Sequence, residues 1–333
     1  MITKRRERGQ VVVPLLAIDG GGTKTIAIIT DETGTILGTG QSGTSNYHVT
    51  GKENTIKTLQ NVISDAVERF KKEASLAGDT DVVIKLGVFA LAGLDTETDQ
   101  ANVQEIVKNV IADSGVRFGK VIVENDALSA LLGATNGQPG VLLIAGTGSI
   151  AFAHDGNGEF LRSGGWGHLL GDEGGGYWIG KEAISAILKM FDGRGTETLL
   201  ADLVIDYLKL ESHEQLYNWV YGPGYSIHKV AALSTIVEEA YLKGDLVSRE
   251  ILDRAVDELF ALICGVAKHS GILGKPFKLL FLGGVLQNSD YIKEALTKKV
   301  HEEMPNVELL PNHQKPINLI IQRGLSICQG DGC

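Results

Sequence analysis

Cysteine is scarce in this chain: there are three among 333 residues, at Cys264, Cys328 and Cys333, and no CxxC pair. This spacing provides neither a metal-binding framework nor a set of disulfides, and it is typical of a protein from a reducing compartment. The eight histidines are scattered and show no metal-ligand spacing. No stretch is apolar over enough residues to span a membrane. The composition therefore argues against a disulfide scaffold, an iron–sulfur protein and a membrane anchor.

Positive charge is also in the minority, because 31 lysines and arginines stand against 41 aspartates and glutamates, a formal net charge of −10. This balance argues against nucleic acid or an anionic membrane as a partner, whereas a phosphorylated small molecule needs only a local positive field. The basic segment 1–10 precedes an apolar run that is short, contains Pro14 and lacks a small-residue cleavage site. We therefore predict a disordered tail there instead of a signal peptide, and a cytoplasmic protein.

Glycine, in contrast, is abundant at 42 residues, and its clusters lie at the ends of predicted strands. The apolar run 15–18 ends on Asp19, after which residues 20–22 are all glycine and residues 23–25 are Thr-Lys-Thr. The chain then continues as a strand at 26–29, whereas a P-loop or a Rossmann turn opens a helix. Backbone N–H groups at a glycine turn, with hydroxyls and an amine beside them, suit a phosphate group.

The same pattern returns 124 positions later. Gly22 and Thr23 fall on Gly146 and Thr147, and further identities in the same register follow at Ile26, Ala27, Asp31, Gly34 and Gly40. Hairpins around glycine turns resemble one another in general, but a run of matches in one register favours a duplicated unit. The chain length also predicts two domains. We therefore expect two similar domains, each with a phosphate-binding hairpin, facing each other across a cleft that holds a nucleotide.

Hydrophobic periodicity predicts the remaining elements of a mixed α/β fold. In the first half it predicts strands at 35–39, 82–94 and 120–123, and helices at 53–74, 98–114 and 127–133. In the second half it predicts strands at 141–145, 279–282 and 307–310, a hairpin that turns at 155–158, and helices at 181–191, 196–209, 213–220, 228–243, 247–270, after 288 and at 316–328.

Two carboxylates are placed where open α/β sheets bind ligands. Asp126 closely follows the strand residues 121–123, and a carboxylate at that edge can accept a proton from a substrate hydroxyl. Asp126 is also well suited to capping the helix 127–133, and taken alone this second interpretation is the stronger one. Asp19 is either a turn residue or the ligand of a hydrated Mg²⁺ beside nucleotide phosphates. Its place between an apolar strand and three glycines favours the magnesium site.

Residues 164–178 read Gly-Gly-Trp-Gly-His-Leu-Leu-Gly-Asp-Glu-Gly-Gly-Gly-Tyr-Trp. Aromatic rings pack on the C–H faces of sugars and carboxylates accept hydrogen bonds from sugar hydroxyls, so this mixture predicts a sugar-binding loop. Glu173 can instead be a supporting or capping residue, and His168 is weak evidence for a base. The spacing at 175–182 approaches a P-loop, but Glu182 replaces the required hydroxyl and no strand precedes it.

With these residues assembled, the chain resembles the N-acetylglucosamine kinases of the BadF/BadG/BcrA/BcrD ATPase family, within the actin, sugar-kinase and heat-shock-chaperone superfamily. The resemblance covers residues 13–328. It implies an α/β fold of two ribonuclease-H-like domains, the actin-like ATPase fold, with a cleft between them. The first domain would be residues 1–126, to which a helix at 316–330 returns, and the second would be residues 127–315 with a helical insertion. It also implies domain closure on substrate and, as is common among such proteins, a homodimer.

The resemblance further implies roles for individual residues. The segments 19–25 and 145–149 look like the family's two phosphate loops, 282–285 looks like the adenosine motif, and 124–127 matches the segment of the catalytic base, which strengthens that role for Asp126. The residues implied for ATP and its phosphates are Asp19, Gly21, Gly22, Thr23, Lys24, Gly146, Thr147, Gly148, Gly283 and Gly284. Those implied for the sugar are Asn46, Asn125, Ser149, Trp166, Gly167 and Asp172.

These roles imply an ATP-dependent kinase that phosphorylates N-acetylglucosamine, at its 6-hydroxyl, with Mg²⁺ held near Asp19 through water. One alternative is a nucleotide-switched ATPase that acts on a protein partner. Another is a kinase for glucosamine, N-acetylmuramic acid or glucose, because one methylene or hydroxyl changes discrimination by only about 1–3 kcal/mol in an apolar pocket. The family also contains ATPase subunits that activate benzoyl-CoA-type reductases, and the cysteines here do not fit the iron–sulfur cluster that those need.

Overall fold

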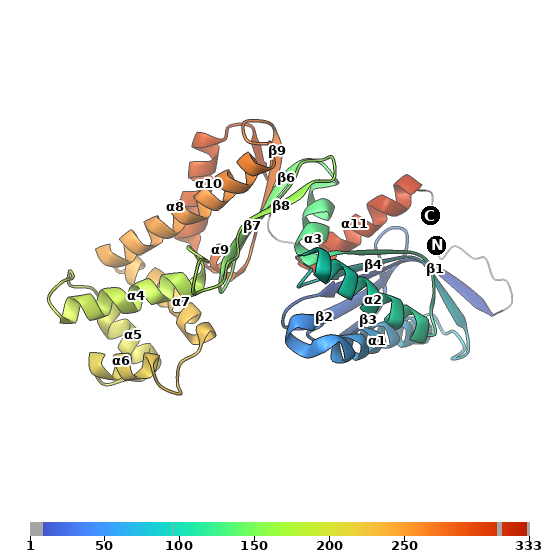
Figure 1. Ribbon diagram of the computed structural model, residues 1–333, viewed down its shortest axis with the longest axis horizontal. Coiled ribbons are helices and arrows are strands. Elements are labelled where there is room, and N and C mark those ends of the chain that lie inside the picture. The colour runs from blue at the N-terminus through green and yellow to red at the C-terminus, as the bar shows by residue number, and fades with distance from the viewer. Residues whose placement is uncertain (1–8, 95, 312–314, 332–333) are drawn as a thin grey trace. The chain divides into compact units, whose positions relative to one another are not determined.

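The first three strands are joined by short turns, and each later strand of the first sheet follows a helix. The computed structural model describes residues 9–94, 96–311 and 315–331; most of the tail predicted to be disordered lies outside them. The first unit contains the elements β1 (Gln10–Gly20), β2 (Lys24–Thr30), β3 (Ile36–Gly43), α1 (Tyr47–Glu73), β4 (Asp81–Leu91), α2 (Glu97–Asp113), β5 (Arg117–Asn125), α3 (Asp126–Thr135) and, from the end of the chain, α11 (Pro316–Asp331) (Figure 1). Their strands form one sheet in the order β3-β2-β1-β4-β5.

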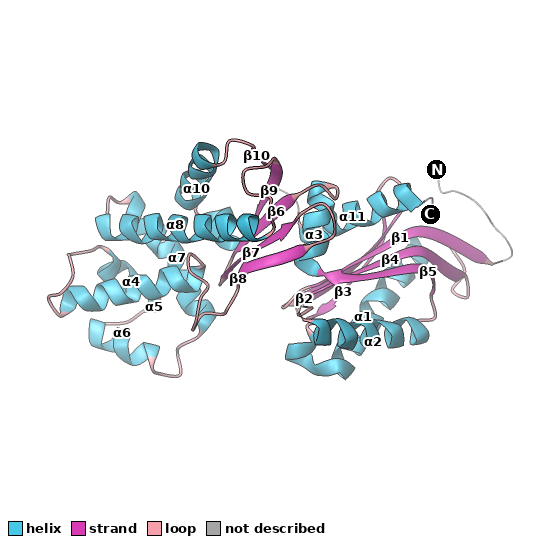
Figure 2. Ribbon diagram, turned by 45° about the horizontal axis from the view of Figure 1, so that its top comes forward, coloured by secondary structure: helices cyan, strands magenta, loops and turns pink. Residues whose placement is uncertain are grey.

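Helices cover both faces of this sheet. The helices α1 and α2 pack on one face through residues such as Leu59, Val62 and Ile106, and α11 packs on the other through Ile317 and Ile320 (Figure 2). The strand β1 carries Pro14 at the point where its pairing with β2 begins, one residue before Leu15. Proline has no N–H to donate, so this position beside the end of a ladder accommodates it.

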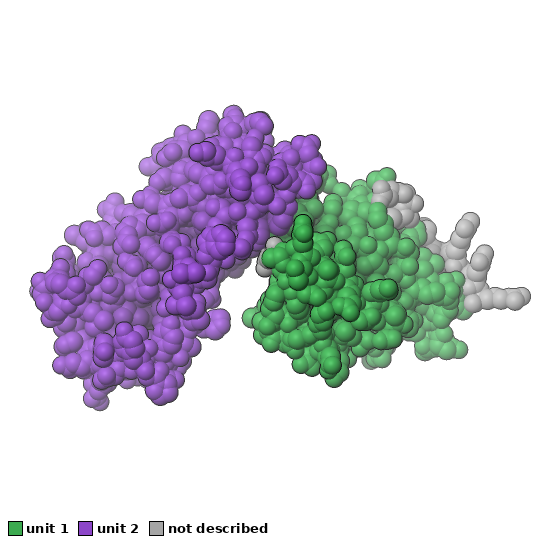
Figure 3. Space-filling model, viewed as in Figure 1, with its two compact units in different colours: residues 1–138, 313–333 green, residues 139–312 purple. Residues whose placement is uncertain are grey.

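The chain divides into two compact units, residues 1–138 with 313–333 and residues 139–312 (Figure 3). From the sequence, a boundary after Asp126 was expected, whereas the units divide after Gln138. The reason is that α3 packs tightly against α11: a Cβ on Gly133 would lie 1.9 Å from the carbonyl oxygen of Leu319. The returning C-terminal helix therefore keeps α3 in the first unit.

The second unit repeats the sheet of the first. It contains β6 (Gly140–Ala145), β7 (Ser149–His154), β8 (Phe160–Gly164), α4 (Gly176–Phe191), α5 (Leu200–Leu208), α6 (His213–Val220), α7 (Ile227–Leu242), α8 (Leu246–His269), β9 (Phe277–Leu282), α9 (Gly284–Asn288), α10 (Asp290–Glu303) and β10 (Val307–Leu309). Its strand order, β10-β9-β6-β7-β8, has the same pattern of parallel and antiparallel neighbours as the first sheet. The helix α8 packs on this sheet, α4 and α7 pack against α8, and α5 and α6 pack against α4.

The repeat differs at its glycine turns. In the first unit, the last paired residues before and after the turn are Gly20 and Thr25, whereas in the second they are Ala145 and Ser149, so the second turn is one residue shorter. Three predicted helices also have clearly different starts. The helix expected from 196 begins at Leu200. The one expected from 181 begins at Gly176, so the last residues of the predicted loop 164–178 are helical. The one expected from 53 begins at Tyr47, with a break at Gly51 (φ 77°, ψ 162°). None of the described helices combines the length and apolar character that a membrane span needs.

Candidate active site

The first glycine turn leaves its predicted phosphate-binding residues accessible. Gly22, Thr23 and Lys24 are exposed, while the backbone N–H of Gly21 donates to the carbonyl of Lys24 at 3.0 Å and closes the turn. The hydroxyl of Thr44 donates to the carbonyl of Gly21 at 3.0 Å and fixes the turn from outside. The turn therefore presents hydroxyl, ammonium and backbone groups to solvent from a hydrogen-bonded base.

Asp19 lies at the end of β1, directly before this turn. Burial raises the pKa of its carboxyl above the usual 3.8, and the nearby Lys24 ammonium partly offsets that increase. A bound cation would favour the charged carboxylate in this surrounding. Among the described residues no group of three or more His, Cys, Asp or Glu is arranged around a metal site. A single carboxylate suits Mg²⁺, which keeps several waters and takes its other ligands from phosphates.

The second glycine turn is built onto the first turn of α4. Within the turn, the N–H of Gly146 donates to the carbonyl of Gly148 at 2.9 Å. The carbonyls of Gly146 and Thr147 accept hydrogen bonds from the N–H groups of Gly176 and Tyr177, at 2.8 and 2.9 Å. The N-terminus of this 16-residue helix carries a partial positive charge, which favours an anion beside the turn.

The predicted sugar loop is attached to the same turn through Asp172. This residue has a positive φ of 63°, and its Oδ1 accepts a hydrogen bond from the N–H of Gly167 at 3.2 Å. A Cβ on Gly148 would lie 2.2 Å from Asp172 Oδ2, so only glycine allows this approach. The hydroxyl of Ser149 donates to the carbonyl of Glu173 at 2.6 Å. Burial raises the pKa of Asp172, although the N–H groups of Gly167 and Ser149 oppose the increase.

Trp166 projects from this loop with 64% of its surface exposed. The guanidinium of Arg162 lies 4.7 Å from the centre of its ring. An exposed indole held in this way offers an apolar face to the C–H groups of a sugar. The structure thus brings Ser149, Gly167 and Asp172 together around the second glycine turn and leaves the ring of Trp166 accessible.

At the end of β5 the structure separates the two interpretations of Asp126. The N-cap of α3 is Asn125, whose side-chain oxygen accepts from the N–H groups of Ala127 and Leu128 at 2.9 and 3.2 Å. The helix cap considered for Asp126 is therefore provided by the preceding residue, Asn125. Asp126 is the first residue of the helix, and its Oδ1 accepts from the N–H of Ala127 at 2.9 Å. The half-buried Asp126 carboxylate thus lies at a positive helix end.

The two amides predicted to bind sugar both cap helices in the first unit. Asn125 is 5% exposed, and its Nδ2 donates to the carbonyl of Leu94 at 3.3 Å. Asn46 is the N-cap of α1, and its Oδ1 accepts from the N–H of His48 at 3.0 Å. Asn46 is the more accessible of the two, because it is only half-buried.

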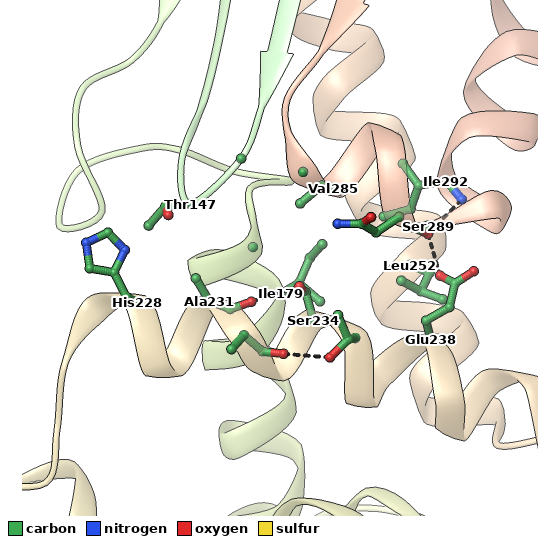
Figure 4. Close-up of a pocket in the computed structure, with 16 residues that line it drawn as sticks. Thr147, Ile179, His228, Ala231, Ser234, Glu238, Leu252, Val285, Ser289 and Ile292 are labelled. Atoms are coloured by element: carbon green, nitrogen blue, oxygen red, sulfur yellow. Dashed lines mark hydrogen bonds between the residues drawn. The ribbon is translucent and has the colours of Figure 1, made fainter. Parts of the chain in front are cut away.

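A pocket of about 430 Å³ opens beside the second glycine turn, entirely within the second unit. Three predicted nucleotide-binding residues line it: Gly146, Thr147 and Gly284. Figure 4 shows Thr147 and His228 at one end of the pocket and Glu238 and Ser289 at the other. Apolar side chains line the space between them, namely Ile179, Leu252, Val285 and Ile292.

Comparison with known proteins places the chain among nucleotide-dependent enzymes. Residues 16–317 match the model of the BadF/BadG/BcrA/BcrD ATPase family. The chain belongs to this family. It is 36% identical over 296 residues to an N-acetylmuramic acid/N-acetylglucosamine kinase of Clostridium acetobutylicum, which covers 89% of this chain and 93% of that protein. It is 34% identical to an N-acetyl-D-glucosamine kinase of Dictyostelium discoideum, over 89% of this chain and 92% of that one.

The fold also matches a solved structure from Chromobacterium violaceum, a protein whose function as an N-acetylglucosamine kinase is itself an assignment. The match has a TM-score of 0.68 at 22% identity and covers 94% of this chain and 99% of that one. At this identity the likeness shows the fold, an α/β fold of paired units with equivalent sheets. The range matched by the family, residues 16–317, contains every residue that the sequence predicted for the site.

The sequence did not predict most of the residues that line the pocket in the second unit. The helix α7 contributes His228, Ala231, Ala232, Ser234, Thr235 and Glu238, which repeat at helical spacing along one side. Glu238 accepts hydrogen bonds from the hydroxyl of Ser289 and, at 3.1 Å, from the N–H of Tyr291. The apolar residues of 228–270 were correctly expected to form core, but this small and polar stripe follows no motif. Its only sequence signal is that helical spacing.

Proposed function

We propose that this protein is an ATP-dependent amino-sugar kinase that transfers the γ-phosphate of ATP to N-acetylglucosamine, at its 6-hydroxyl. The attachment of the sugar loop to the second glycine turn carries the proposal. Asp172 contacts Gly148 of that turn, and the same turn borders the pocket through Gly146 and Thr147. A sugar held by the loop and a nucleotide held by the pocket would therefore meet at one phosphate-binding turn. The names of the two relatives above support the choice of an amino sugar.

In this proposal the pocket of the second unit binds the nucleoside of ATP. The base would lie between the apolar side chains Ile179, Leu252 and Val285, because planar rings lose little entropy and bury much apolar area there. The phosphates would extend toward Thr147 and the N-terminus of α4, where the helix dipole favours negative charge. A volume of about 430 Å³ is within the range of sites for ligands of this size.

Asp126 is proposed as the general base that takes the proton of the acceptor hydroxyl. It is the first residue of α3, directly after the N-cap Asn125, and its Oδ1 accepts a hydrogen bond from the N–H of Ala127 at 2.9 Å. Asn46, Trp166 and Asp172 would orient the sugar. Phosphoryl transfer needs little covalent help from the protein, so positioning and charge stabilisation would provide most of the acceleration.

Asp19 would hold a hydrated Mg²⁺ against the phosphates. The ion would neutralise the negative charge that develops on the phosphate oxygens. Thr23, Lys24 and the backbone of the first glycine turn would bind phosphate groups of the nucleotide. Exclusion of water on substrate binding would keep water from accepting the γ-phosphate in place of the sugar hydroxyl, so that ATP is not wasted by hydrolysis.

The experiment that tests the proposal measures ADP release from Mg-ATP in a coupled assay. N-acetylglucosamine, N-acetylmuramic acid, glucosamine, N-acetylmannosamine and glucose are added separately. Strong stimulation by N-acetylglucosamine, with its 6-phosphate as the product, is the expected result. Stimulation by only one of the other sugars would assign that sugar, instead of N-acetylglucosamine, as the acceptor. A slow ATPase that no sugar stimulates would refute the kinase and favour a nucleotide-switched regulator.

A further inference from the structure

Asp99 is a buried carboxylate that no part of the proposed mechanism uses. It is the third residue of α2 and is only 6% exposed. Its Oδ2 accepts from the N–H and the hydroxyl of Thr96, at 2.9 and 2.8 Å, and forms a capping box. Its Oδ1 faces another element, where it accepts from the hydroxyl of Tyr47 and lies 3.1 Å from Nε2 of His48. A helix cap requires only the first set of contacts.

The second set holds a turn of chain that is tied to the rest of α1 only at its last residue among the described contacts, where Asn54 Nδ2 donates to the carbonyl of Thr50 at 3.0 Å and the hydroxyls of Thr50 and Thr55 lie 3.0 Å apart. Residues 47–50 form one helical turn, closed by hydrogen bonds from Val49 and Thr50 to the carbonyl of Asn46 at 3.0 and 3.1 Å. The non-helical backbone of Gly51 separates this turn from the remainder of α1. Its direction therefore depends on contacts to other elements as well as on those two hydrogen bonds, and the carboxylate of Asp99 supplies two such contacts at the start of the turn.

This turn carries Asn46, the amide predicted to bind the sugar. The N–H of Asn46 donates to the hydroxyl of Thr44 at 3.1 Å, and that hydroxyl donates to the carbonyl of Gly21 in the first glycine turn. On its other side the turn is in close contact with Gly93, where a Cβ would lie 2.8 Å from Asn46 Oδ1 and 3.0 Å from the ring of His48. Polar contacts thus run from the phosphate-binding turn through Asn46 to Asp99.

We propose that Asp99 is a positioning residue for the acceptor sugar: through Tyr47 and His48 it holds the amide of Asn46 in the geometry that binds the sugar. This inference rests on the proposed function, in which Asn46 contacts the acceptor. Asp99 itself does not touch the substrate. Loss of its Oδ1 contacts weakens sugar binding, whereas loss of its capping contacts affects only the stability of α2.

Steady-state kinetics with N-acetylglucosamine and ATP, on four variants of the full chain, separate these two roles. Tyr47→Phe with His48→Leu removes the Oδ1 contacts and keeps the capping box. Thr96→Ala removes the capping hydroxyl and keeps the Oδ1 contacts. Asp99→Asn weakens both sets. Glu97→Gln is the matched control, because it removes an exposed acidic charge from the same first turn of α2.

The expected result is a rise of about tenfold in the KM for the sugar in the double variant and in Asp99→Asn, since each loses hydrogen bonds to a charged group. Their kcat should stay within about threefold, and their KM for ATP should not change. Thr96→Ala should lower the melting temperature and leave both KM values at the wild-type level, and Glu97→Gln should change neither. Amide hydrogen exchange should be faster at residues 46–50 in Asp99→Asn but not in Glu97→Gln.

Two results would overturn the positioning role while the kinase stands: a sugar KM within about twofold of wild type in the double variant and in Asp99→Asn, or an equal rise in Thr96→Ala. A wild-type protein that no amino sugar stimulates would instead overturn the proposed function and, with it, this role. The two failures are distinguishable because only the second appears in the unmodified chain. Normal hydrogen exchange in the strands of the first sheet shows that each variant is folded.

Discussion

Gly283 occupies a position in which the backbone of the neighbouring strand leaves no room for a side chain. Its φ is 100° and its ψ is 157°, a conformation that is essentially restricted to glycine. A Cβ there would lie 2.2 Å from the carbonyl oxygen and 2.5 Å from the carbonyl carbon of Ala145, in the central strand β6. These are backbone atoms of a paired strand, so they cannot move aside as a side chain would. Gly283→Ala therefore has two separate costs.

The backbone conformation costs about 1–3 kcal/mol for a residue other than glycine. Forcing a methyl group into closely packed surroundings costs about another 1–3 kcal/mol. The variant should therefore lose about 2–6 kcal/mol of the free energy of unfolding. In a unit of this size the melting temperature changes by about 2–4 °C for each kcal/mol, so it should fall by about 4 °C or more.

Gly284→Ala is the matched control. A Cβ on Gly284 would lie 3.7 Å from Nδ2 of Asn288, an ordinary contact, and its φ is not positive. This variant should melt within about 1 °C of wild type, but its methyl group would enter the pocket and raise the KM for ATP. The assay is thermal unfolding of the full chain without ligand, followed by ATP kinetics. A Gly283→Ala protein that melts like wild type would refute the reasoning from backbone contact.

Three further predictions follow from single carboxylates and their partners. Asp126→Asn should lower kcat by about 10² or more with little change in either KM, because an amide cannot take the proton; near wild-type turnover would exclude Asp126 as the base. Since burial raises the pKa of Asp19 above 3.8, its charge destabilises the folded chain at neutral pH and not below the unfolded pKa. Asp19→Asn should therefore raise the melting temperature of the ligand-free protein at pH 7, with a gain that disappears below about pH 4; a gain that persists there would contradict this cause. Arg323→Met should cost about 3–5 kcal/mol in urea unfolding, because it leaves the mostly buried carboxylate of Glu124, now 2.9 Å from the guanidinium, without its cation, and adding Glu124→Gln should restore much of the loss.

The repeated pattern in the sequence predicted the fold well. Gly22 and Gly146 marked two equivalent hairpins, and both sheets have the same arrangement of strands around them. This success has a local cause, because a short continuous apolar run indicates a strand buried on both faces and glycines indicate the turn that follows. The start of α1 was missed for a local reason as well. The residues 47–52 are mostly polar and contain Gly51, so they show no helical period.

Neighbouring residues of similar chemistry could not be separated from sequence. Asn125 and Asp126 are both good N-cap residues, and only the backbone at the end of β5 decides that Asn125 caps α3. The roles given to Asp19, Asp126 and the sugar loop as ligand-binding residues stay predictions, which the assays above test.

By itself, therefore, the sequence determined the elements and the chemically distinctive residues at their ends: the two glycine turns, Asp19, and the loop with Trp166 and Asp172. Only the tertiary structure decided which distant side chains meet. The contact of Glu238 with Ser289, and that of Asp99 with Tyr47, each join elements about fifty residues apart. The apolar period of a helix fixes which side faces the core, but it does not fix its rotation and shift relative to the next helix. Those two quantities come from packing, and they determine which polar residues form the pocket wall and hold the sugar-binding turn.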